Sequence, residues 1–222
     1  MRLLAVVATE QERAALLRSL TAVPVPVGPY RAARTPAADV LVSGIGPGAA
    51  AAATATAAAL GPYELALSLG ICGAFRGTAA PGDLVVATEL VAADLGADST
   101  EGFLSMSALG WADDVAAVDP ELVTAAAARL GEVVTGPLVT VSTVTGTRAR
   151  ADVLADRYGA VGEAMEGWGV LEGARPFGLP VLEVRAVSNL VSDRDTSTWD
   201  IPAAFAALAG AGESLLQEAW WS

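Results

Sequence analysis

Residues 39–60, DVLVSGIGPGAAAAATATAAAL, combine an apolar run, a glycine-rich turn and an alanine-rich stretch. The run at 39–43 predicts a buried strand, the glycines of 44–48 predict a tight turn, and residues 49–60 favour a helix. The turn lacks the G-x-G-x-x-G spacing of dinucleotide-binding turns, and no acidic residue ends a second strand where a ribose would need one. Strand, turn and helix in this order are the repeating unit of an α/β fold.

The same alternation continues on both sides of this stretch. We predict strands at 3–8, 65–69, 83–88, 137–144 and 181–188, and helices after Thr9 and at 120–130, 148–158, 166–174 and 201–220. Residues 93–114 lose the periodicity and predict a long functional loop. The composition has no break, so we expect residues 1–222 to form one domain, a three-layer α/β/α sandwich around a mixed, largely parallel sheet.

The composition excludes several classes of function. Hydrophobic residues make up 53% of the 222 residues and charged residues 17%, yet no uninterrupted apolar run is long enough to span a bilayer, so we expect no membrane partner. Asp and Glu number 25 against 13 basic residues, and the net charge of −12 disfavours nucleic acid as a partner. His and Lys are absent, which removes histidine-dependent catalysis and Schiff-base chemistry.

The cysteine count points to a cytoplasmic protein. Cys72 stands alone, so the chain has neither an internal disulfide nor a cysteine-rich zinc site, which fits a reducing compartment. With the commonest metal ligand also missing, we expect neither a metal nor an organic cofactor. The chemistry must then use carboxylates, amides, hydroxyls or Arg.

Candidate carboxylates stand at two places: one follows the first predicted strand, at the sheet edge where ligands of α/β folds bind, and two lie between a strand-like stretch and a predicted helix. Glu12 either faces a pocket or serves only as the capping-box partner of Thr9. Glu163 and Glu166 flank Met165, and they form either part of a site or a solvated helix start.

Polar and small residues end other strands at the same edge. Ser188 and Asn189 close a buried strand, either as ligand-binding groups or as a turn. Ile71, Gly73 and Val144 follow neighbouring strands, so we expect them to contact a substrate.

Five motifs occur in the order found in the purine nucleoside phosphorylase and nucleosidase superfamily, which the chain resembles over nearly its full length. They are TEQE (9–12), SGIG (43–46), LGICGAF (69–75) with PGD (81–83), AMEG (164–167) and RAVSN (185–189). Within the superfamily the chain most resembles the futalosine hydrolases, through VSTVTGT (141–147), EAMEG (163–167) and VSNLVSDRD (187–195). The resemblance implies an N-glycosyl hydrolase that splits hypoxanthine from futalosine in menaquinone biosynthesis.

The resemblance also implies roles for single residues. Glu12 matches the carboxylate that polarises the attacking water, Glu166 the one that holds the ribose hydroxyls, and Met165 the side chain packed on the sugar. Asn189 stands where adenine-cleaving nucleosidases have Asp. Its amide can donate to a 6-oxo group and accept from a protonated N7, which favours hypoxanthine over adenine.

Water is the expected nucleophile. Ser68 and Ile71 occupy the positions at which the phosphorylases have a phosphate-binding Arg and Ser. A phosphate anion would lose a charge-assisted partner there and meet an apolar side chain, which is costly.

The 5′ side of futalosine carries a carboxylated aryl ketone, which needs an apolar slot ending in a cation. We expect Phe103, with Leu104 and Met106, to form the slot and Arg148 or Arg194 to bind the carboxylate. Core packing for Phe103 and a surface role for either Arg are the alternatives. In relatives this loop often reaches across a subunit interface, which implies a homo-oligomer, a dimer or higher.

Three other functions remain open from the sequence. One is a nucleosidase for methylthioadenosine or aminodeoxyfutalosine, against which Asn189 argues. Another is a purine nucleoside phosphorylase, against which Ser68 argues. The third is a non-catalytic nucleoside-binding module, and the presence of both Glu12 and Glu166 argues against it.

Overall fold

The elements of the fold follow the predicted alternation of strands and helices, and the computed structural model describes residues 2–221. The strands are β1 (Leu3–Val7), β2 (Val23–Val27), β3 (Tyr30–Arg34), β4 (Ala38–Val42), β5 (Leu65–Ala74), β6 (Leu84–Ala92), β7 (Gly96–Ala97), β8 (Leu104–Ser105), β9 (Val115–Ala117), β10 (Val134–Thr140), β11 (Gly162–Ala164) and β12 (Val181–Leu190). The helices are α1 (Glu10–Leu16), α2 (Pro47–Leu60), α3 (Pro120–Leu130), α4 (Arg148–Tyr158), α5 (Gly167–Ala174) and α6 (Ile201–Leu215), with short 3₁₀ turns at Arg175–Phe177 and Thr196–Thr198.

The main sheet is mixed, in the order β11-β10-β6-β12-β5-β1-β4-β3-β2. Strands β4, β1, β5 and β12 run parallel, as do β6, β10 and β11, and the two groups meet antiparallel between β12 and β6. Strand β11 also pairs with β5, so part of the sheet closes into a ring. The closure, which the sequence does not predict, brings β11 beside the end of β5.

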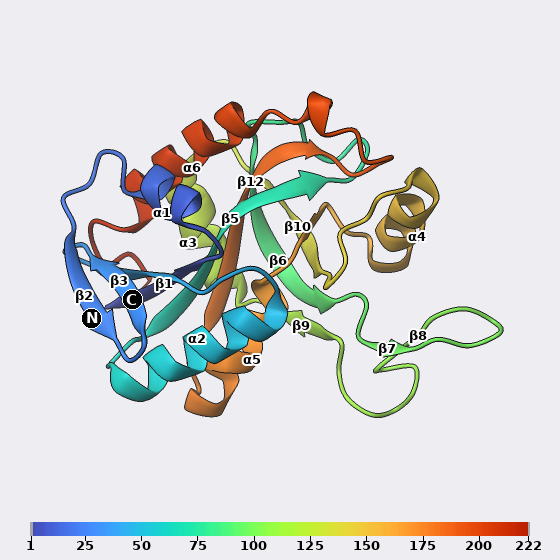
Figure 1. The fold of residues 1–222 in the computed structure, drawn as a ribbon, viewed down its shortest axis with the longest axis horizontal. Coiled ribbons are helices and arrows are strands. Elements are labelled where there is room, and N and C mark those ends of the chain that lie inside the picture. The colour runs from blue at the N-terminus through green and yellow to red at the C-terminus, as the bar shows by residue number, and fades with distance from the viewer. Residues whose placement is uncertain (1, 222) are drawn as a thin grey trace.

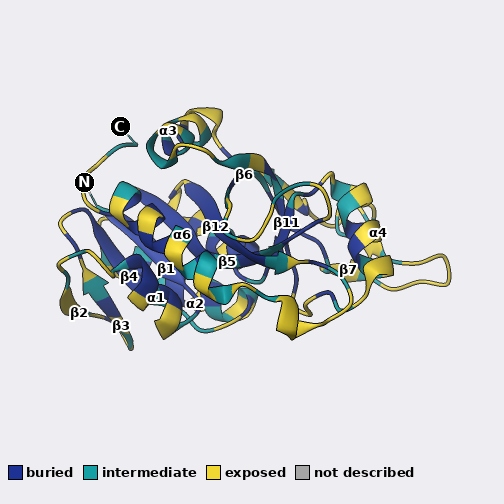
Figure 2. Cartoon of the chain, turned by 90° about the horizontal axis from the view of Figure 1, so that it is seen from above, coloured by how far each residue is buried: buried dark blue, intermediate teal, exposed yellow. Residues whose placement is uncertain are grey.

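Helices cover both faces of the sheet, which confirms the expected three layers. Helices α2 and α5 pack together on one face, and α1, α3 and α6 lie on the other (Figure 1). The strands between them are mostly buried (Figure 2), and all five residues of β1 are buried. Gly173 lets α5 approach α2 closely, because a Cβ at this position would lie 2.8 Å from the Thr54 Cβ. The core therefore fixes the strand ends that carry the candidate site.

Several boundaries differ from the sequence-based expectations. Strands β2 and β3 were not expected, because Pro24 and Pro26 break the pattern; β2 tolerates them because it lies at the edge of the sheet. Strand β5 continues to Ala74, and β10 ends at Thr140, four residues before the predicted end. Helix α6 ends at Leu215 instead of residue 220.

The expected loop at 93–114 projects from the body of the molecule (Figure 1). It contains only the short antiparallel pair β7–β8. Among residues 2–221, no helix is both long and apolar enough to cross a bilayer.

Candidate active site

A cavity of about 660 Å³ lies where β1, β5 and β12 end, as expected for an α/β fold. Most of the predicted site residues line it: Glu12, Ile71, Gly73, Val144, Met165, Glu166, Ser188, Asn189 and Arg194. Residues from five separate segments of the sequence thus meet in one place. Phe103 and Arg148 are not among the lining residues.

Glu12 both caps a helix and faces the cavity, so the two interpretations of this residue hold together. It forms the capping box with Thr9 at the start of α1 and is only 4% exposed. Its Oε2 accepts hydrogen bonds from the amides of Ala8 (3.1 Å) and Thr9 (2.9 Å) and from the Thr9 hydroxyl (2.9 Å). Its Oε1 accepts from the Ile71 amide at 3.1 Å. Donors from two strand ends therefore fix the carboxylate.

Glu166 is held by the glycine-rich turn. Its Oε1 accepts a hydrogen bond of 3.0 Å from the Gly46 amide, and its Oε2 accepts one of 3.2 Å from Arg185 Nη1. Gly46 has a φ of 95°, a conformation that favours glycine. The turn at 44–48 therefore serves to direct a backbone N–H at this carboxylate.

Arg185 is a fully buried cation behind the cavity, and the sequence did not reveal its role. Its Nε donates to Glu183 Oε1 (2.8 Å), its Nη1 to Glu166, and its Nη2 to Ser68 Oγ (2.8 Å). Burial alone would lower the pKa of Arg185, but the carboxylates of Glu183, Glu166 and Glu12 raise it above its usual value. The available signal was Glu183-x-Arg185 in a buried strand, because residues two apart share a face and can pair.

Asn189 lies beside a bulge in β12. The pairing of β12 with β5 shifts between Val187 and Asn189, so Ser188 is the extra residue. The Ser188 hydroxyl lies 2.7 Å from Asn189 Oδ1 and 3.0 Å from the Cys72 carbonyl oxygen. Asn189 Nδ2 donates to the Leu190 carbonyl at 3.2 Å and keeps a second proton for a ligand.

Further lining residues were not singled out from the sequence as site residues. They include Thr145, Glu163, Val191, Trp199, Ile201 and Phe205. In the sequence, Glu163 was noted only as a carboxylate that flanks Met165. Ile201 and Phe205 stand four residues apart at the start of α6, so their helical spacing was the signal. Cys72 also lines the cavity, but burial raises the pKa of its thiol to about 12, which keeps it protonated and a poor nucleophile.

The residues expected at the 5′ side are spread over three places. Arg194 lines the cavity, and its guanidinium lies 5.8 Å from the centre of the Trp199 ring. The amide of Arg148 starts α4 and donates to Asp193 at 3.0 Å. Phe103 lies on the projecting loop, 5.2 Å from the Arg157 guanidinium. Of these three residues, Arg194 alone lines the cavity in the described part of the chain.

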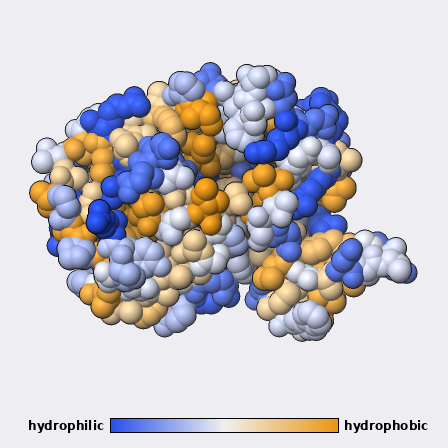
Figure 3. All heavy atoms as spheres, in the orientation of Figure 1, coloured by the Kyte–Doolittle hydropathy of each residue, from blue (hydrophilic) through white to orange (hydrophobic). Residues whose placement is uncertain are grey.

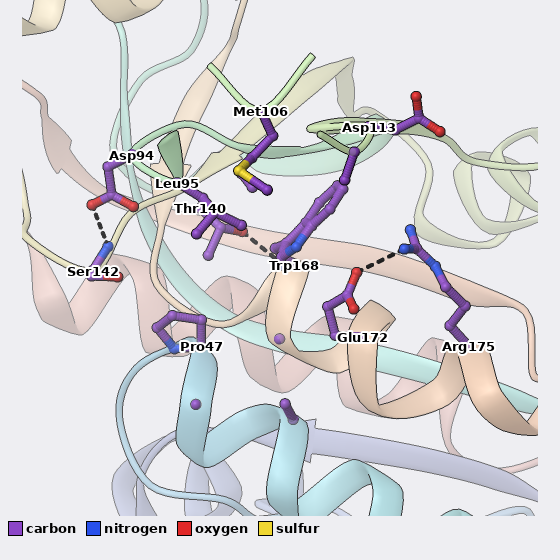
Figure 4. A pocket seen from close by; sticks show the side chains of 15 residues that line it. Pro47, Asp94, Leu95, Met106, Asp113, Thr140, Ser142, Trp168, Glu172 and Arg175 are labelled. Atoms are coloured by element: carbon purple, nitrogen blue, oxygen red, sulfur yellow. Dashed lines mark hydrogen bonds and ion pairs between the residues drawn. The ribbon is translucent and has the colours of Figure 1, made fainter. Parts of the chain in front are cut away.

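A second cavity of about 410 Å³ lies between α2, α5 and the projecting loop. Met106 points toward Trp168 across it, and the Trp168 amide donates to Thr140 Oγ1 at 2.8 Å (Figure 4). Glu172 and Arg175 form an ion pair of 2.9 Å at its rim (Figure 4). It is a separate, largely apolar hollow and contains none of the predicted catalytic residues.

Comparisons with known proteins identify the family. The family model of the phosphorylase superfamily matches residues 2–219. A futalosine hydrolase of Streptomyces coelicolor is 48% identical over 194 residues, which cover 82% of this chain and 80% of that protein. A futalosine hydrolase of Acidothermus cellulolyticus is 46% identical over 197 residues, covering 86% and 80%.

A solved structure supports the fold. The futalosine hydrolase of Helicobacter pylori strain 26695 superposes with a TM-score of 0.82 at 17% sequence identity, covering 97% of this chain and 95% of that chain. The mixed sheet and its helical layers are thus those of the superfamily. From the family model and the identities with curated relatives, the chain belongs to the phosphorylase superfamily and, within it, to the futalosine hydrolases, which are nucleosidases.

Proposed function

We propose that this protein hydrolyses the N-ribosidic bond of futalosine and releases hypoxanthine and dehypoxanthine futalosine. The observation that carries the proposal is the placement of Glu12, Glu166 and Asn189 around one cavity, in a chain 48% identical to a futalosine hydrolase. We also propose that residues 1–222 act as one domain and work in the cytoplasm without metal or cofactor.

Glu12 activates the attacking water in this proposal. Its Oε2 is occupied by three donors, whereas among the described residues only the Ile71 amide donates to its Oε1, which leaves a lone pair for water. Water attacks C1′ as the bond from C1′ to N9 breaks, and Glu12 accepts the proton that the water loses. The sugar passes through an oxocarbenium-like state, so the carboxylates around it stabilise its charge.

Glu166 and Met165 bind the sugar, and Asn189 binds the base. The Glu166 carboxylate accepts from the ribose hydroxyls, and Met165 packs against the ring. The free amide proton of Asn189 donates to the 6-oxo group, while its Oδ1 accepts from N7 once that atom is protonated. The proton on N7 comes from solvent water, and with it the purine leaves as a neutral base, while the proton that Glu12 takes from the attacking water returns to solvent.

Water is favoured over phosphate by the charges behind the cavity. Arg185 is already bound to Glu183, Glu166 and Ser68, so its charge is neutralised within the protein. A phosphate ion would approach the carboxylates of Glu12 and Glu166 without a free cation beside them. Arg194 is the only Arg among the described lining residues, and we assign it to the 5′ carboxylate.

We further propose a homo-oligomer in which the projecting loop of one subunit closes the cavity of another. Ile45 supports this, because it lines the cavity yet is 65% exposed. Phe103 of a neighbouring subunit would then supply the apolar slot for the aryl group, and Arg148 stays the alternative partner of the carboxylate.

Base release tests the proposal. We would incubate the protein with futalosine, aminodeoxyfutalosine, inosine and methylthioadenosine, with and without phosphate, and identify the base by chromatography. We expect hypoxanthine from futalosine at a rate independent of phosphate, and a fall in kcat of about 10²–10⁴-fold in Glu12→Gln.

The matched control is Glu10→Gln on the same helix, since Glu10 is exposed and, among the described residues, forms an ion pair with Arg13 alone. Its activity should equal that of the wild type. Release of adenine, a requirement for phosphate, or full activity of Glu12→Gln would contradict the proposal. Binding without base release would indicate a nucleoside-binding module instead.

A further inference from the structure

Glu163 is a third buried carboxylate in the cavity, and the proposed mechanism does not use it. It lies on β11, is 6% exposed and lines the cavity together with Glu12 and Glu166. Those two carboxylates suffice for the water and the ribose. Burying a further carboxylate costs free energy unless donors compensate it, so its place beside the substrate needs a reason.

The hydrogen bonds of Glu163 leave only hydrogen-bond acceptors for a ligand at this side of the cavity. Its Oε1 accepts from the Thr145 amide at 2.8 Å, and its Oε2 accepts from the Thr145 hydroxyl. Both donors of Thr145 are therefore occupied and cannot serve a ligand. The Glu163 oxygens keep lone pairs, because a carboxylate accepts at about four sites. A ligand atom that meets Glu163 must be a donor.

Glu163 and Asn189 lie in one row of the sheet. Both are paired with Gly73 of β5, Glu163 from β11 on one side and Asn189 from β12 on the other. Residues in such a row project to the same face. Gly73 itself has no side chain in this row, and only glycine fits there, since a Cβ would lie 2.7 Å from Val191 Cγ2 and 3.1 Å from Asn189 Nδ2. Two strand spacings, about 10 Å in all, separate the two backbones, which leaves room for the edge of a flat base between the side chains.

The donors and acceptors on the edge of a 6-oxopurine are complementary to Glu163 and Asn189. This edge presents acceptors at N7 and O6 and a donor at N1–H, whereas adenine presents a donor at the 6-amino group and a lone pair at N1. We propose that Glu163 accepts a hydrogen bond from N1–H of the hypoxanthine base and, with Asn189, makes the cavity selective for 6-oxopurines. With adenine, the carboxylate would face the N1 lone pair. This inference rests on the proposed function and adds its specificity determinant.

The test is the ratio of kcat/KM for futalosine to kcat/KM for aminodeoxyfutalosine, in which an amino group replaces the 6-oxo group. Glu163→Gln keeps the size of the side chain and can donate to N1 of adenine. We expect this ratio to fall by about 100-fold, because a site built for a donor penalises its absence. The preference for hypoxanthine over 1-methylhypoxanthine, measured as a ratio of Kd values, should fall as well, since the steric cost of the methyl group is common to both proteins.

Thr145→Val is the matched control for a purely structural role. It removes the hydroxyl that donates to Glu163 and keeps the amide that also does. We expect it to change kcat/KM for both substrates by similar factors. Equal losses on both substrates in Glu163→Gln, or an unchanged preference for hypoxanthine, would overturn the inference. Wild-type protein that does not cleave futalosine would instead refute the proposed function itself.

Discussion

Arg185 is the residue on which the geometry of the site depends most. It connects Glu166 in the cavity to Glu183 in the core, and burial raises the pKa of the Glu183 carboxyl above its usual value. Arg185→Met should lower the free energy of unfolding by about 3–5 kcal/mol, because it leaves a buried carboxylate without its partner. Glu183→Gln keeps an acceptor for Arg185 Nε and should cost about 1 kcal/mol. Denaturant unfolding measures both, and equal losses would contradict this account.

The sequence predicted the catalytic residues, but it did not predict the residues that hold them in position. Glu12 and Asn189 follow predicted strands whose carboxyl ends meet at one edge, so the convergence of these two follows from the fold class. The role of Glu166 was expected from the resemblance to the superfamily, because the strand before it was not predicted. The spacing of Glu183 and Arg185 indicates only that these two side chains can pair, whereas the contact of Arg185 with Glu166 is revealed by the structure alone. The sequence also did not predict that Glu163 and Asn189 pair with Gly73 from its two sides, since this depends on the antiparallel pairing of the three-residue strand β11.

At the scale of elements, one ion pair links β3 and β4. Arg34 pairs with Asp39 across the two strands and donates to it from Nε and Nη2, each at 2.7 Å, and the Tyr63 hydroxyl donates at 2.8 Å. Burial alone would raise the pKa of Asp39, but these partners together lower it below its usual value. The ionised form is therefore favoured by folding. Its contribution is complete above the pKa of the unfolded chain and is lost as the pH falls through the folded value.

Asp39→Asn tests this linkage. At pH 7 we expect the variant to be less stable by about 1–3 kcal/mol, because Arg34 loses a bidentate acceptor. The difference in Tm between wild type and variant should begin to shrink as the pH falls below about 4, where Asp39 of the unfolded chain takes up a proton, and should go on shrinking until the folded carboxylate is protonated at a lower pH. Thermal unfolding followed by circular dichroism at several pH values measures this. A difference independent of pH would show that the charge of Asp39 is not the cause.

The elements themselves were predictable where periodicity was strong. Helix α3 and helix α4 were predicted with the bounds that the structure has, since caps and turn residues flank both. The hairpin of β2 and β3 was missed because its prolines forbid a central strand but not an edge strand. The extension of β5 through Gly70 was missed because glycines usually end strands, whereas here Gly70 makes room for the Glu12 carboxylate.

At the scale of the molecule, apolar side chains gather on the side of the projecting loop. Figure 3 shows apolar surface on this loop and a hollow between the loop and the body. Trp111 is 68% exposed, Leu95 49% and Leu104 39%. Ile45, which lines the active-site cavity, is also an exposed apolar side chain. Large exposed apolar patches are typical of interfaces, and Trp is often the residue that contributes most to binding.

Trp111→Ser tests whether this surface joins subunits. A single chain has a mass of 22.3 kDa, and we expect light scattering to give at least twice this value for the wild type at micromolar concentration. The variant should dissociate at concentrations at least about tenfold higher, because an interfacial Trp contributes about 2 kcal/mol or more. Val23→Ser is the control, since Val23 is 55% exposed on the edge strand β2, away from the loop.

If the loop of one subunit closes the cavity of another, dissociation should raise KM for futalosine more than KM for inosine, which lacks the aryl group. A monomeric wild type with full activity would contradict both the oligomer and the shared cavity.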